Sequence, residues 1–369
     1  MYISDLKMVN YRNYIDEKIE FVNGVNIFVG NNAQGKTNLI ESVYYCSRGN
    51  SFKRVKDNDI IRHNTDTATL DAQIIRADRR KLIHIELGSE KKISINEIKI
   101  NTLKDMKSQF DIVYFWPDHL RIIKDGPSLR RDLIDEAIIN LKPSYKNMIA
   151  VYNRLLIQRN SLIKKGKNQK YFREQLIGIT KKLSDIGASI FLLRNRYIEI
   201  LNDKGYNIHL DISDNTEKLI LRYDNSLKIE DLNKHSKKDI SDLLYDKIIS
   251  SLQMDLRNGY TSIGPHRDDI DMEINGLNAK IFASQGQQRS IVLSLKLAEM
   301  EIISHYNGSS PILLLDDVFS ELDKIRREKF LNMIKNTQAL ITTNEINLEK
   351  DEIREIDYKI FKIEEGKIK

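Results

Sequence analysis

Two short stretches, far apart along this chain, carry residues suited to chemistry on a phosphate group. The first, GNNAQGKT at residues 30–37, fits the pattern G-x-x-x-x-G-K-[S/T]. Its glycines let backbone N–H groups surround phosphates, and a helix that begins there adds partial positive charge. The residues expected to bind nucleotide are Gly30, Asn31, Asn32, Ala33, Gln34, Gly35, Lys36 and Thr37, with Lys36 on the β and γ phosphates and the Thr37 hydroxyl on Mg²⁺.

The second stretch is PILLLDD at 311–317, an apolar segment that ends in two carboxylates. Sheets of α/β proteins place their ligands at the C-terminal ends of strands. Asp316 would hold Mg²⁺, directly or through water, and Asp317 would orient and deprotonate an attacking water. By itself such a strand is common. Together with the phosphate loop it predicts ATP and Mg²⁺ as cofactors, with Lys36 and Asp317 as the catalytic residues.

A third motif, SQGQQR at 284–289, opens a stretch with helical spacing. Ser284 would cap this helix, and Gly286 would let the backbone approach a phosphate. An ordinary capped helix start is the alternative. Most phosphate-loop proteins hold the loop and the Mg²⁺ carboxylate within one compact domain, whereas here a long insertion separates them.

The elements that must position these motifs change character along the chain. KIEF, the turn Asn23–Gly24 and VNIFVG predict a hairpin that ends in a buried strand. TATLDAQII, KLIHIEL and KKISINEIKI, within 67–100, predict further strands. From Ser128 the spacing becomes helical, and two long helices joined by KKGKNQ predict an antiparallel hairpin. Beyond them, residues 202–240 contain the strand-like pieces NIHLDI and KLILRY.

Charge is distributed unevenly within a formal total of +6. Residues 141–182 hold eleven Lys and Arg against one acid, Glu174. These cations are Lys142, Lys146, Arg154, Arg159, Lys164, Lys165, Lys167, Lys170, Arg173, Lys181 and Lys182. A basic segment of this kind favours contact with DNA phosphates, and a solvated helical face is the alternative. Nothing resembles a base-reading helix or a zinc module, so a preference for DNA structure over sequence is expected.

The location expected from the sequence is the cytoplasm. The chain starts without a secretory signal pattern, and no segment approaches the roughly 18 apolar residues of a membrane span. A lone cysteine, Cys46, cannot form an internal disulfide, and its apolar neighbours predict a buried core residue.

In their order, these motifs resemble the ABC ATPase head as it is split in SMC-type proteins. The resemblance implies an α/β head formed by 1–110 and 258–369, with a mainly helical second lobe from 111–257. It also implies an ATP-dependent homodimer, in which Ser284, Gly286 and Gln287 act on ATP bound by the partner chain. Asp323, at the end of SELD (320–323), would lie across that interface.

Within that class the chain resembles the RecF family of bacterial DNA replication and repair proteins, nearly end to end. The resemblance rests on LKMVNYRNY, GNNAQGKTNLIESVYY, FWPDHLRIIKDGPSLRRDLID, LIQRNSLIKK, TSIGPHRDDI, SQGQQRSIVLSLKLAE and PILLLDDVFSELD. It implies ATP-dependent binding of DNA at gaps or single-strand to double-strand junctions, and help to mediators of the RecR and RecO type in loading a recombinase. It further implies a weak, DNA-stimulated ATPase that acts as a switch, because Asp317 is shorter than the Glu usual at this place in transport ABC proteins.

Three departures from the ABC or RecF pattern are visible. Thr343 and Asn344 stand where ABC heads usually present a His, so one γ-phosphate contact stays open. SRGNSFKR at 47–54 deviates from the usual Gly-Arg-Ser-x-Arg, which leaves nucleotide contacts by Arg48 or Lys53 undecided. No Gln near FWPDHL can be assigned to the loop that links the two lobes.

Three other functions compete with the DNA-clamp reading. GPHRDD at 264–269 offers His266, Asp268 and Asp269 as metal ligands, and hence a nuclease attached to the head. A transporter ATPase subunit needs similar motifs, but the long insertion, the missing His and the basic helices argue against it. A purely structural clamp without turnover differs from a slow ATPase only in its rate.

Overall fold

The computed structural model describes residues 1–53, 55–77, 79–100, 106, 109–166, 171–318, 322–344 and 356–369. The chain forms two compact units. Unit 1 comprises 1–120, 208–216 and 285–369, and unit 2 comprises 121–207 and 217–284. Residues 258–284, expected in the head, thus fall in unit 2, because strand β10 (Asp269–Ile274) pairs there with β9 (Leu219–Asp224).

A largely parallel sheet of six strands lies at the centre of unit 1, in the order β15-β14-β3-β13-β12-β8. Its strands are β3 (Val25–Val29), β8 (Ile112–Phe115), β12 (Ile312–Leu315), β13 (Ala339–Thr343), β14 (Tyr358–Glu364) and β15 (Lys367–Ile368). Both β12 and β13 are buried along their whole length. Continuous apolar strands of this kind are typical of parallel sheets covered on both faces, and the strand predicted from PILLLDD is confirmed.

The second sheet of unit 1 is antiparallel, in the order β2-β1-β4-β5-β6-β7. Its strands are β1 (Tyr2–Tyr11), β2 (Tyr14–Glu20), β4 (Ala68–Arg76), β5 (Arg79–Leu87), β6 (Lys92–Ile95) and β7 (Ile98–Lys99). The strands predicted within 67–100 are confirmed. The hairpin expected at Asn23–Gly24 is wrong: β2 pairs with β1, whereas β3 pairs in parallel with β13 and β14 of the other sheet.

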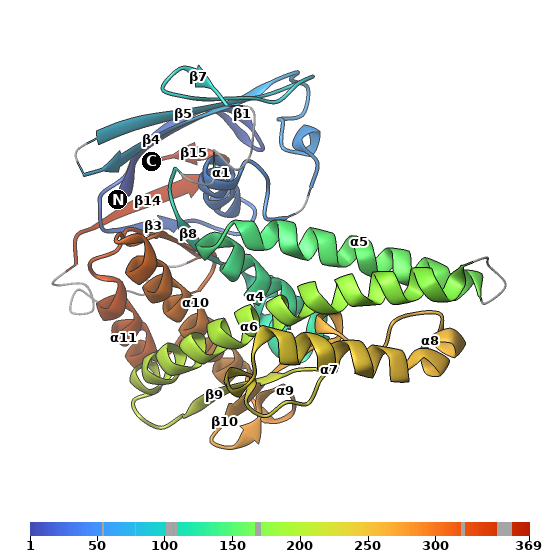
Figure 1. The fold of residues 1–369 in the computed structure, drawn as a ribbon. Helices are drawn as coiled ribbons and strands as arrows, with labels where there is room; N and C mark the ends of the chain where they lie inside the picture. Colours follow the sequence, from blue (N-terminus) through green and yellow to red (C-terminus); the bar gives the residue numbers. More distant parts are fainter. Residues whose placement is uncertain are drawn as a thin grey trace. The chain divides into compact units, whose positions relative to one another are not determined.

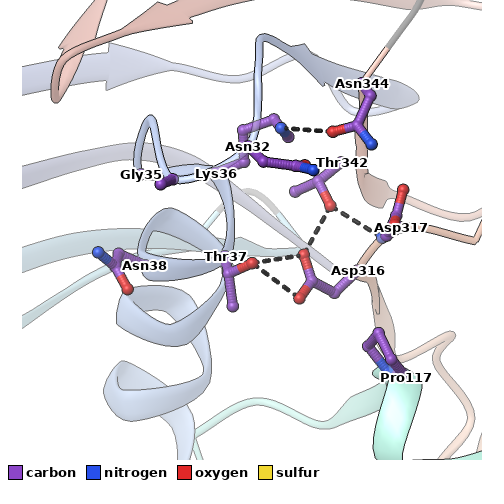
Figure 2. Close-up of a pocket in the computed structure, with 11 residues that line it drawn as sticks. Asn32, Gly35, Lys36, Thr37, Asn38, Pro117, Asp316, Asp317, Thr342 and Asn344 are labelled. Carbon is purple, nitrogen blue, oxygen red and sulfur yellow. Dashed lines mark hydrogen bonds between the residues drawn. The ribbon is translucent and has the colours of Figure 1, made fainter.

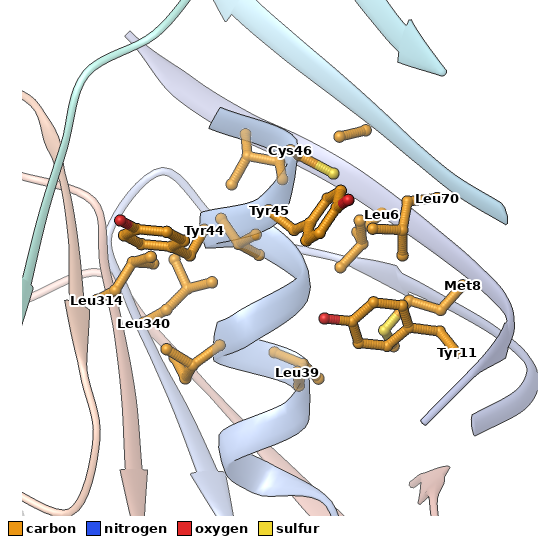
Figure 3. Close-up of a cluster of buried hydrophobic side chains, with 14 of the residues drawn as sticks. Leu6, Met8, Tyr11, Leu39, Tyr44, Tyr45, Cys46, Leu70, Leu314 and Leu340 are labelled. Atoms are coloured by element: carbon orange, nitrogen blue, oxygen red, sulfur yellow. The ribbon is translucent and has the colours of Figure 1, made fainter. Parts of the chain in front are cut away.

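Helix α1 (Lys36–Arg48) packs into the shared core of the two sheets, and nearly all of its residues are buried. Figure 3 shows Tyr45 and Cys46 facing the side of Leu6 in β1, and Tyr44 facing the side of Leu314 in β12. Cys46 is fully buried, as predicted, and burial raises the pKa of its thiol. The apolar residues of α1 contribute to this core, and its buried polar residues, such as Glu41 and Ser47, are hydrogen-bonded.

Besides α1, the described part of unit 1 contains α10 (Gln285–Asn307), α11 (Lys324–Ile334) and the short 3₁₀ segments Asp57–Asp59 and Pro117–Leu120. The helix predicted to follow SQGQQ is confirmed as α10.

Unit 2 is mainly helical, with a small sheet in the order β11-β10-β9. Its elements include α3 (Arg121–Lys124), α4 (Pro127–Leu141), α5 (Ser144–Lys165), α7 (Lys237–Ser250), α8 (Leu252–Asn258), α9 (Ala279–Phe282), β11 (Leu277–Asn278) and the 3₁₀ segments Leu232–Lys234 and Pro265–Arg267. Helix α6 (Phe172–Ile212) belongs to unit 2 as far as residue 207, and its last residues belong to unit 1. The predicted helical hairpin is confirmed as α5 and α6, which run side by side (Figure 1).

One segment with a strand-like sequence pattern is helical in the structure. NIHLDI at 207–212 forms the last turns of α6, although KLILRY does form β9. Its alternating apolar residues suggest a strand, but Ile208 and Ile212 are four residues apart and both are buried. That spacing also fits one face of a helix.

Within the described residues, no helix is both long and apolar enough to cross a membrane.

Arg159 does not belong to the surface charge of the basic segment. Its side chain is fully buried, and Nη1 donates to Asp255 Oδ2 at 2.7 Å and to Thr261 Oγ1 at 2.6 Å. Nε donates to Thr180 Oγ1 at 3.2 Å, which joins α5 to α6. The expectation that Arg159 contributes to a DNA footprint is therefore wrong.

Replacing Asp255 with Asn should lower the free energy of unfolding by about 3–5 kcal/mol, because it leaves the buried Arg159 charge without its counterion. Denaturant unfolding measures the change. Asp185→Asn is the matched control, since Asp185 forms only an exposed pair with Lys237 at 2.9 Å, worth about 0–1 kcal/mol. Equal effects of the two substitutions would contradict a structural role for the buried pair.

Candidate nucleotide site

The phosphate loop connects β3 to α1, and two of its glycines are required by close packing. A Cβ on Gly30 would lie 2.3 Å from the carbonyl oxygen of Ile363 in β14. Gly35, directly before α1, has a φ of 118°, and a Cβ there would lie 2.5 Å from Asn13 Nδ2. Asn13, in the β1–β2 turn, also donates to the Gln34 carbonyl at 2.9 Å. The turn therefore holds the loop in shape.

Lys36 is held at the mouth of this loop. Its Nζ donates to the carbonyls of Gly30 and Asn31 at 2.6 and 2.9 Å and to Asn344 Oδ1 at 3.0 Å (Figure 2). Burial lowers the pKa of Lys36, and the nearby aspartates oppose that shift. Of the two residues considered for the position of the missing His, Asn344 is the one that contacts the lysine.

Thr37 and Asp316, from opposite ends of the sequence, meet directly. Thr37 Oγ1 donates to the two carboxylate oxygens of Asp316 at 3.0 and 2.9 Å. Burial raises the pKa of Asp316, while hydrogen bonds from Thr342 and Thr37 act in the opposite direction. A hydroxyl beside a carboxylate is the set of hard oxygen donors that Mg²⁺ prefers, so these residues fit the expected metal.

Thr342, near the end of β13, links the two aspartates. Its hydroxyl donates to Asp316 Oδ1 at 2.6 Å and accepts from the backbone N–H of Asp317 at 2.9 Å. Asp317 itself has a φ of 53°, in the left-handed region that a non-glycine residue rarely adopts. The Thr342 hydroxyl thus holds the Asp316 side chain and the Asp317 backbone in place just after β12.

These residues line one pocket of about 220 Å³. The lining residues are Asn32, Ala33, Gly35, Lys36, Thr37, Asn38, Pro117, Asp316, Asp317, Thr342 and Asn344 (Figure 2). Three of them, Asn38, Pro117 and Thr342, were not identified from the sequence. The volume is below the roughly 300–1,000 Å³ of pockets that bury a whole small molecule, so it accounts for the phosphate end of a nucleotide.

The signature residues lie apart from this pocket. Ser284 directly precedes α10, and the Gly286 carbonyl accepts from Ser290 Oγ at 3.1 Å. Among the described lining residues, none comes from 285–289, a range that includes Gln287. Asp323 caps α11 by accepting from the Arg326 N–H at 2.9 Å, and Ser320 lies outside the described residues.

The two basic residues left undecided near α1 differ in their surroundings. Arg48 is buried and donates to the Ile112 carbonyl at 3.4 Å, and it does not line the pocket. Lys53 Nζ donates at 3.2 Å to Asn38, which does line it. Of the two, Lys53 is the one that contacts a residue of the pocket lining.

An ion pair that was not predicted from the sequence holds α1 against the antiparallel sheet. Glu41 is fully buried and accepts from Arg12 Nε and Nη2 at 3.0 and 2.8 Å. Ser51 Oγ donates to the same carboxylate. Because Arg12 follows β1, this pair joins α1 to the antiparallel sheet.

The GPHRDD block is occupied by structural contacts within unit 2. His266 contacts the Tyr152 hydroxyl through Nδ1 at 2.8 Å and the Thr261 carbonyl through Nε2 at 3.0 Å. Burial lowers the pKa of His266 to about 4. Asp268 accepts from Tyr223, and Asp269 accepts from Arg130 at 2.6 and 2.8 Å. The described part of the chain contains no group of three or more His, Cys, Asp or Glu able to hold a metal, so the nuclease alternative lacks a site.

Comparison with known proteins adds a family to this geometry. Residues 2–368 match the family described as RecF/RecN/SMC N terminal domain. The chain is 38% identical over 371 residues to the DNA replication and repair protein RecF of Clostridium acetobutylicum, covering 100% of this chain and 99% of that protein. It is 39% identical over 350 residues to the protein of the same name in Acetivibrio thermocellus, covering 94% of each.

Solved structures agree with this relationship. A structure described as the recombination mediator protein RecF-ATP in the RecFOR pathway superposes with a TM-score of 0.85 at 34% identity, covering 100% of this chain and 97% of that one. An Smc head bound to the C-winged helix domain of ScpA gives 0.60 at 16% identity, covering 100% and 96%, which shows the shared fold alone.

Replacing Thr342 with Val should weaken Mg²⁺-dependent ATP binding by about 5- to 30-fold, because one buried hydrogen bond to Asp316 and one to Asp317 are lost at about 1–2 kcal/mol. Binding needs the Asp316 carboxylate, so affinity should fall as the pH drops through its raised pKa. Without the Thr342 hydrogen bond the pKa of Asp316 rises further. The loss of ATP affinity on acidification, the acid limb of the pH profile, should therefore begin at a higher pH.

A fluorescent ATP analogue, titrated with and without Mg²⁺ across a pH series, measures both effects. Thr342→Ser, which keeps the hydroxyl, is the control and should retain the wild-type profile. A Val variant with an unshifted acid limb would contradict the linking role of this hydroxyl.

Proposed function

The chain belongs to the RecF family of SMC-like ATPase heads, and from that premise we propose that it is an ATP-dependent DNA-binding protein of recombinational repair and replication restart. The observation that carries the proposal is the meeting of Lys36 and Thr37 with Asp316 and Asp317 around one pocket. ATP is the proposed cofactor, in keeping with the relative described in its ATP form.

ATP is proposed to join two copies of the chain into a clamp. The pocket has space for phosphates, and no described residue of 285–289 is among those that line it. Ser284, Gly286 and Gln287 of one copy would then cap the γ-phosphate held by the other. Asp323, exposed at the start of α11, would lie at the same interface.

Hydrolysis is proposed to be slow and to act as the release step. Mg²⁺, held by Thr37 and Asp316, would neutralise charge on the phosphates. Lys36 would exchange its present acceptors, two loop carbonyls and Asn344, for phosphate oxygens. Asp317 would accept a proton from the attacking water, and its short side chain places the carboxylate farther from that water than a Glu would. The expected activity is a weak, DNA-stimulated ATPase.

DNA is proposed to contact the exposed cations of unit 2. Arg159 is left out because it is buried. The described and exposed cations are Lys142, Lys146, Arg154, Lys164, Lys165, Arg173, Lys181 and Lys182. Each phosphate contact releases counterions, so affinity should fall steeply with salt. Gaps and single-strand to double-strand junctions are the proposed targets.

We extend the proposal to partners and location. Mediators of the RecR and RecO type, which would load a recombinase, fit the pathway named for the solved relatives. A cytoplasmic location fits a protein that acts on DNA.

Lys36→Ala should abolish ATP-dependent dimerisation and DNA binding together, because Lys36 carries the main positive charge at the phosphate site. Sedimentation with ATP, with and without gapped DNA, at two salt concentrations measures both. Lys18→Ala, at an exposed pair with Glu20, is the control and should behave as wild type. If ATP changes neither assembly nor DNA affinity in the wild-type protein, the clamp proposal fails.

Asp317→Asn should retain ATP-dependent dimerisation but lower turnover by about 10²-fold or more, since the proton acceptor is lost. Dissociation from DNA after ATP addition should slow in parallel. Steady-state phosphate release and DNA dissociation kinetics test this. If DNA dissociates at the wild-type rate while turnover is lost, hydrolysis is not the release step and the protein is a clamp without a hydrolytic timer.

A further inference from the structure

A shallow groove runs along the seam between α5 and α6, and none of its lining residues belongs to the nucleotide pocket. It has a volume of about 640 Å³. Its lining residues are Leu155, Ile157, Gln158, Ser161, Leu162, Gln175, Gly178, Ile179 and Lys182. Four of these are large aliphatic side chains, which makes the floor and walls of the groove predominantly apolar.

The apolar side chains of this groove are poorly covered by their own chain. Ile157 is 69% exposed, and Ile177, next to the groove on α6, is 48% exposed. Single exposed apolar residues are ordinary, but a cluster around a hollow is characteristic of a surface that binds something. The buried stripe of α5, formed by Tyr145, Tyr152 and Arg159, is made of other residues. Of the groove's apolar residues, Leu162 also packs against the buried cluster of Ile163, Phe172 and Leu176, whereas Ile157 points away from the buried stripe and stays largely exposed.

Gly178 provides an independent observation. It lies in the interior of α6, where glycine is less favourable for helix stability than alanine. No heavy atom lies within 4 Å of the position that a Cβ would occupy, so nothing in the chain requires a glycine there. The missing side chain opens the groove down to the helix backbone, which allows another helix to approach closely.

The rim of the groove is positively charged. Lys182 lines it, and Arg154 and Lys165 lie one helical turn from the lining residues Gln158 and Ser161. Within the part of the chain that the structure describes, these three cations are exposed and take part in none of the ion pairs. The one acid between 141 and 182 is Glu174. The groove therefore combines an apolar floor with unneutralised positive charge.

We propose that this groove docks an acidic amphipathic helix of a partner protein. The apolar stripe of such a helix would fill the seam over Gly178, and its flanking carboxylates would meet Arg154, Lys165 and Lys182, as in other helix-in-groove interfaces. A DNA backbone would satisfy the cations but has no apolar ridge to cover Leu155, Ile157 and Ile179. This role shares Arg154, Lys165 and Lys182 with the proposed DNA contact, but it does not need nucleotide.

The test uses the full chain without nucleotide and a labelled synthetic peptide. The peptide carries Leu at a helical i, i+3, i+4, i+7 spacing and Glu at most other positions. A second peptide of the same composition disperses the leucines around the helix. Fluorescence anisotropy at about 0.15 M salt should give at least tenfold tighter binding for the first peptide.

Gly178→Leu fills the groove and should weaken binding of the amphipathic peptide at least tenfold. The space around Gly178 is open, and Leu has the higher helix propensity, so the variant should fold. Ile157→Ser removes an apolar contact and should also weaken binding. Ala150→Leu, which adds the same bulk at an exposed position of α5 outside the groove, is the matched control.

Equal binding of the two peptides, or full binding by Gly178→Leu, would overturn the proposal. So would a tenfold loss of gapped-DNA affinity in Gly178→Leu with unchanged peptide binding, which would assign the groove to DNA. ATP-dependent dimerisation should be the same in Gly178→Leu as in the wild type. That measurement separates a failure of this proposal from a failure of the clamp.

Discussion

Burial of α1 on all its sides is the constraint on which the nucleotide site depends. The helix is enclosed by the apolar faces of two six-stranded sheets, and its charged Glu41 is paired with Arg12 rather than exposed to water. Packing at interior density leaves such a helix no freedom to slide or rotate. Its first residues, Lys36 and Thr37, are consequently fixed relative to the strand ends that carry the other half of the site. The cost of enclosing a carboxylate is met by the bidentate Arg12 contact and by Ser51.

The strand order of the central sheet then couples the binding residues to the hydrolytic ones. β13 lies between β3, which leads into the phosphate loop, and β12, which ends at the aspartates. From this middle position Thr342 contacts both aspartates, and Asn344, just beyond the strand, contacts Lys36. The short backbone stretch 342–344 therefore connects the contact to Lys36 with the contacts to the two aspartates. At the position of the missing His stands Asn344, whose side-chain oxygen accepts from Lys36.

The sequence predicted the residues with intrinsic chemistry and the strands or helices that carry them, because spacing alone defines a phosphate loop and an apolar strand with terminal carboxylates. It did not predict Thr342 or Pro117, whose roles follow from which strands are neighbours. The hairpin at Asn23–Gly24 failed for the same reason, since a turn motif does not specify the sheet of the next strand. Arg159 was predicted to be surface charge, although Tyr145, Tyr152 and Arg159 follow one another at seven-residue intervals, which places Arg159 on the buried stripe of α5.

The pairing of β3 also has a consequence for how the protein is made. Its two neighbours, β13 and β14, begin at Ala339 and Tyr358, so both edges of this apolar strand lack partners until some 300 residues later in the chain. At roughly 5–20 residues per second, a ribosome needs on the order of 15–60 seconds to supply them. During that interval a nascent chain has a phosphate loop without its carboxylates and a strand prone to wrong pairing. Until residues 339–364 have been made, the ATP site is therefore incomplete and β3 has neither of its partner strands.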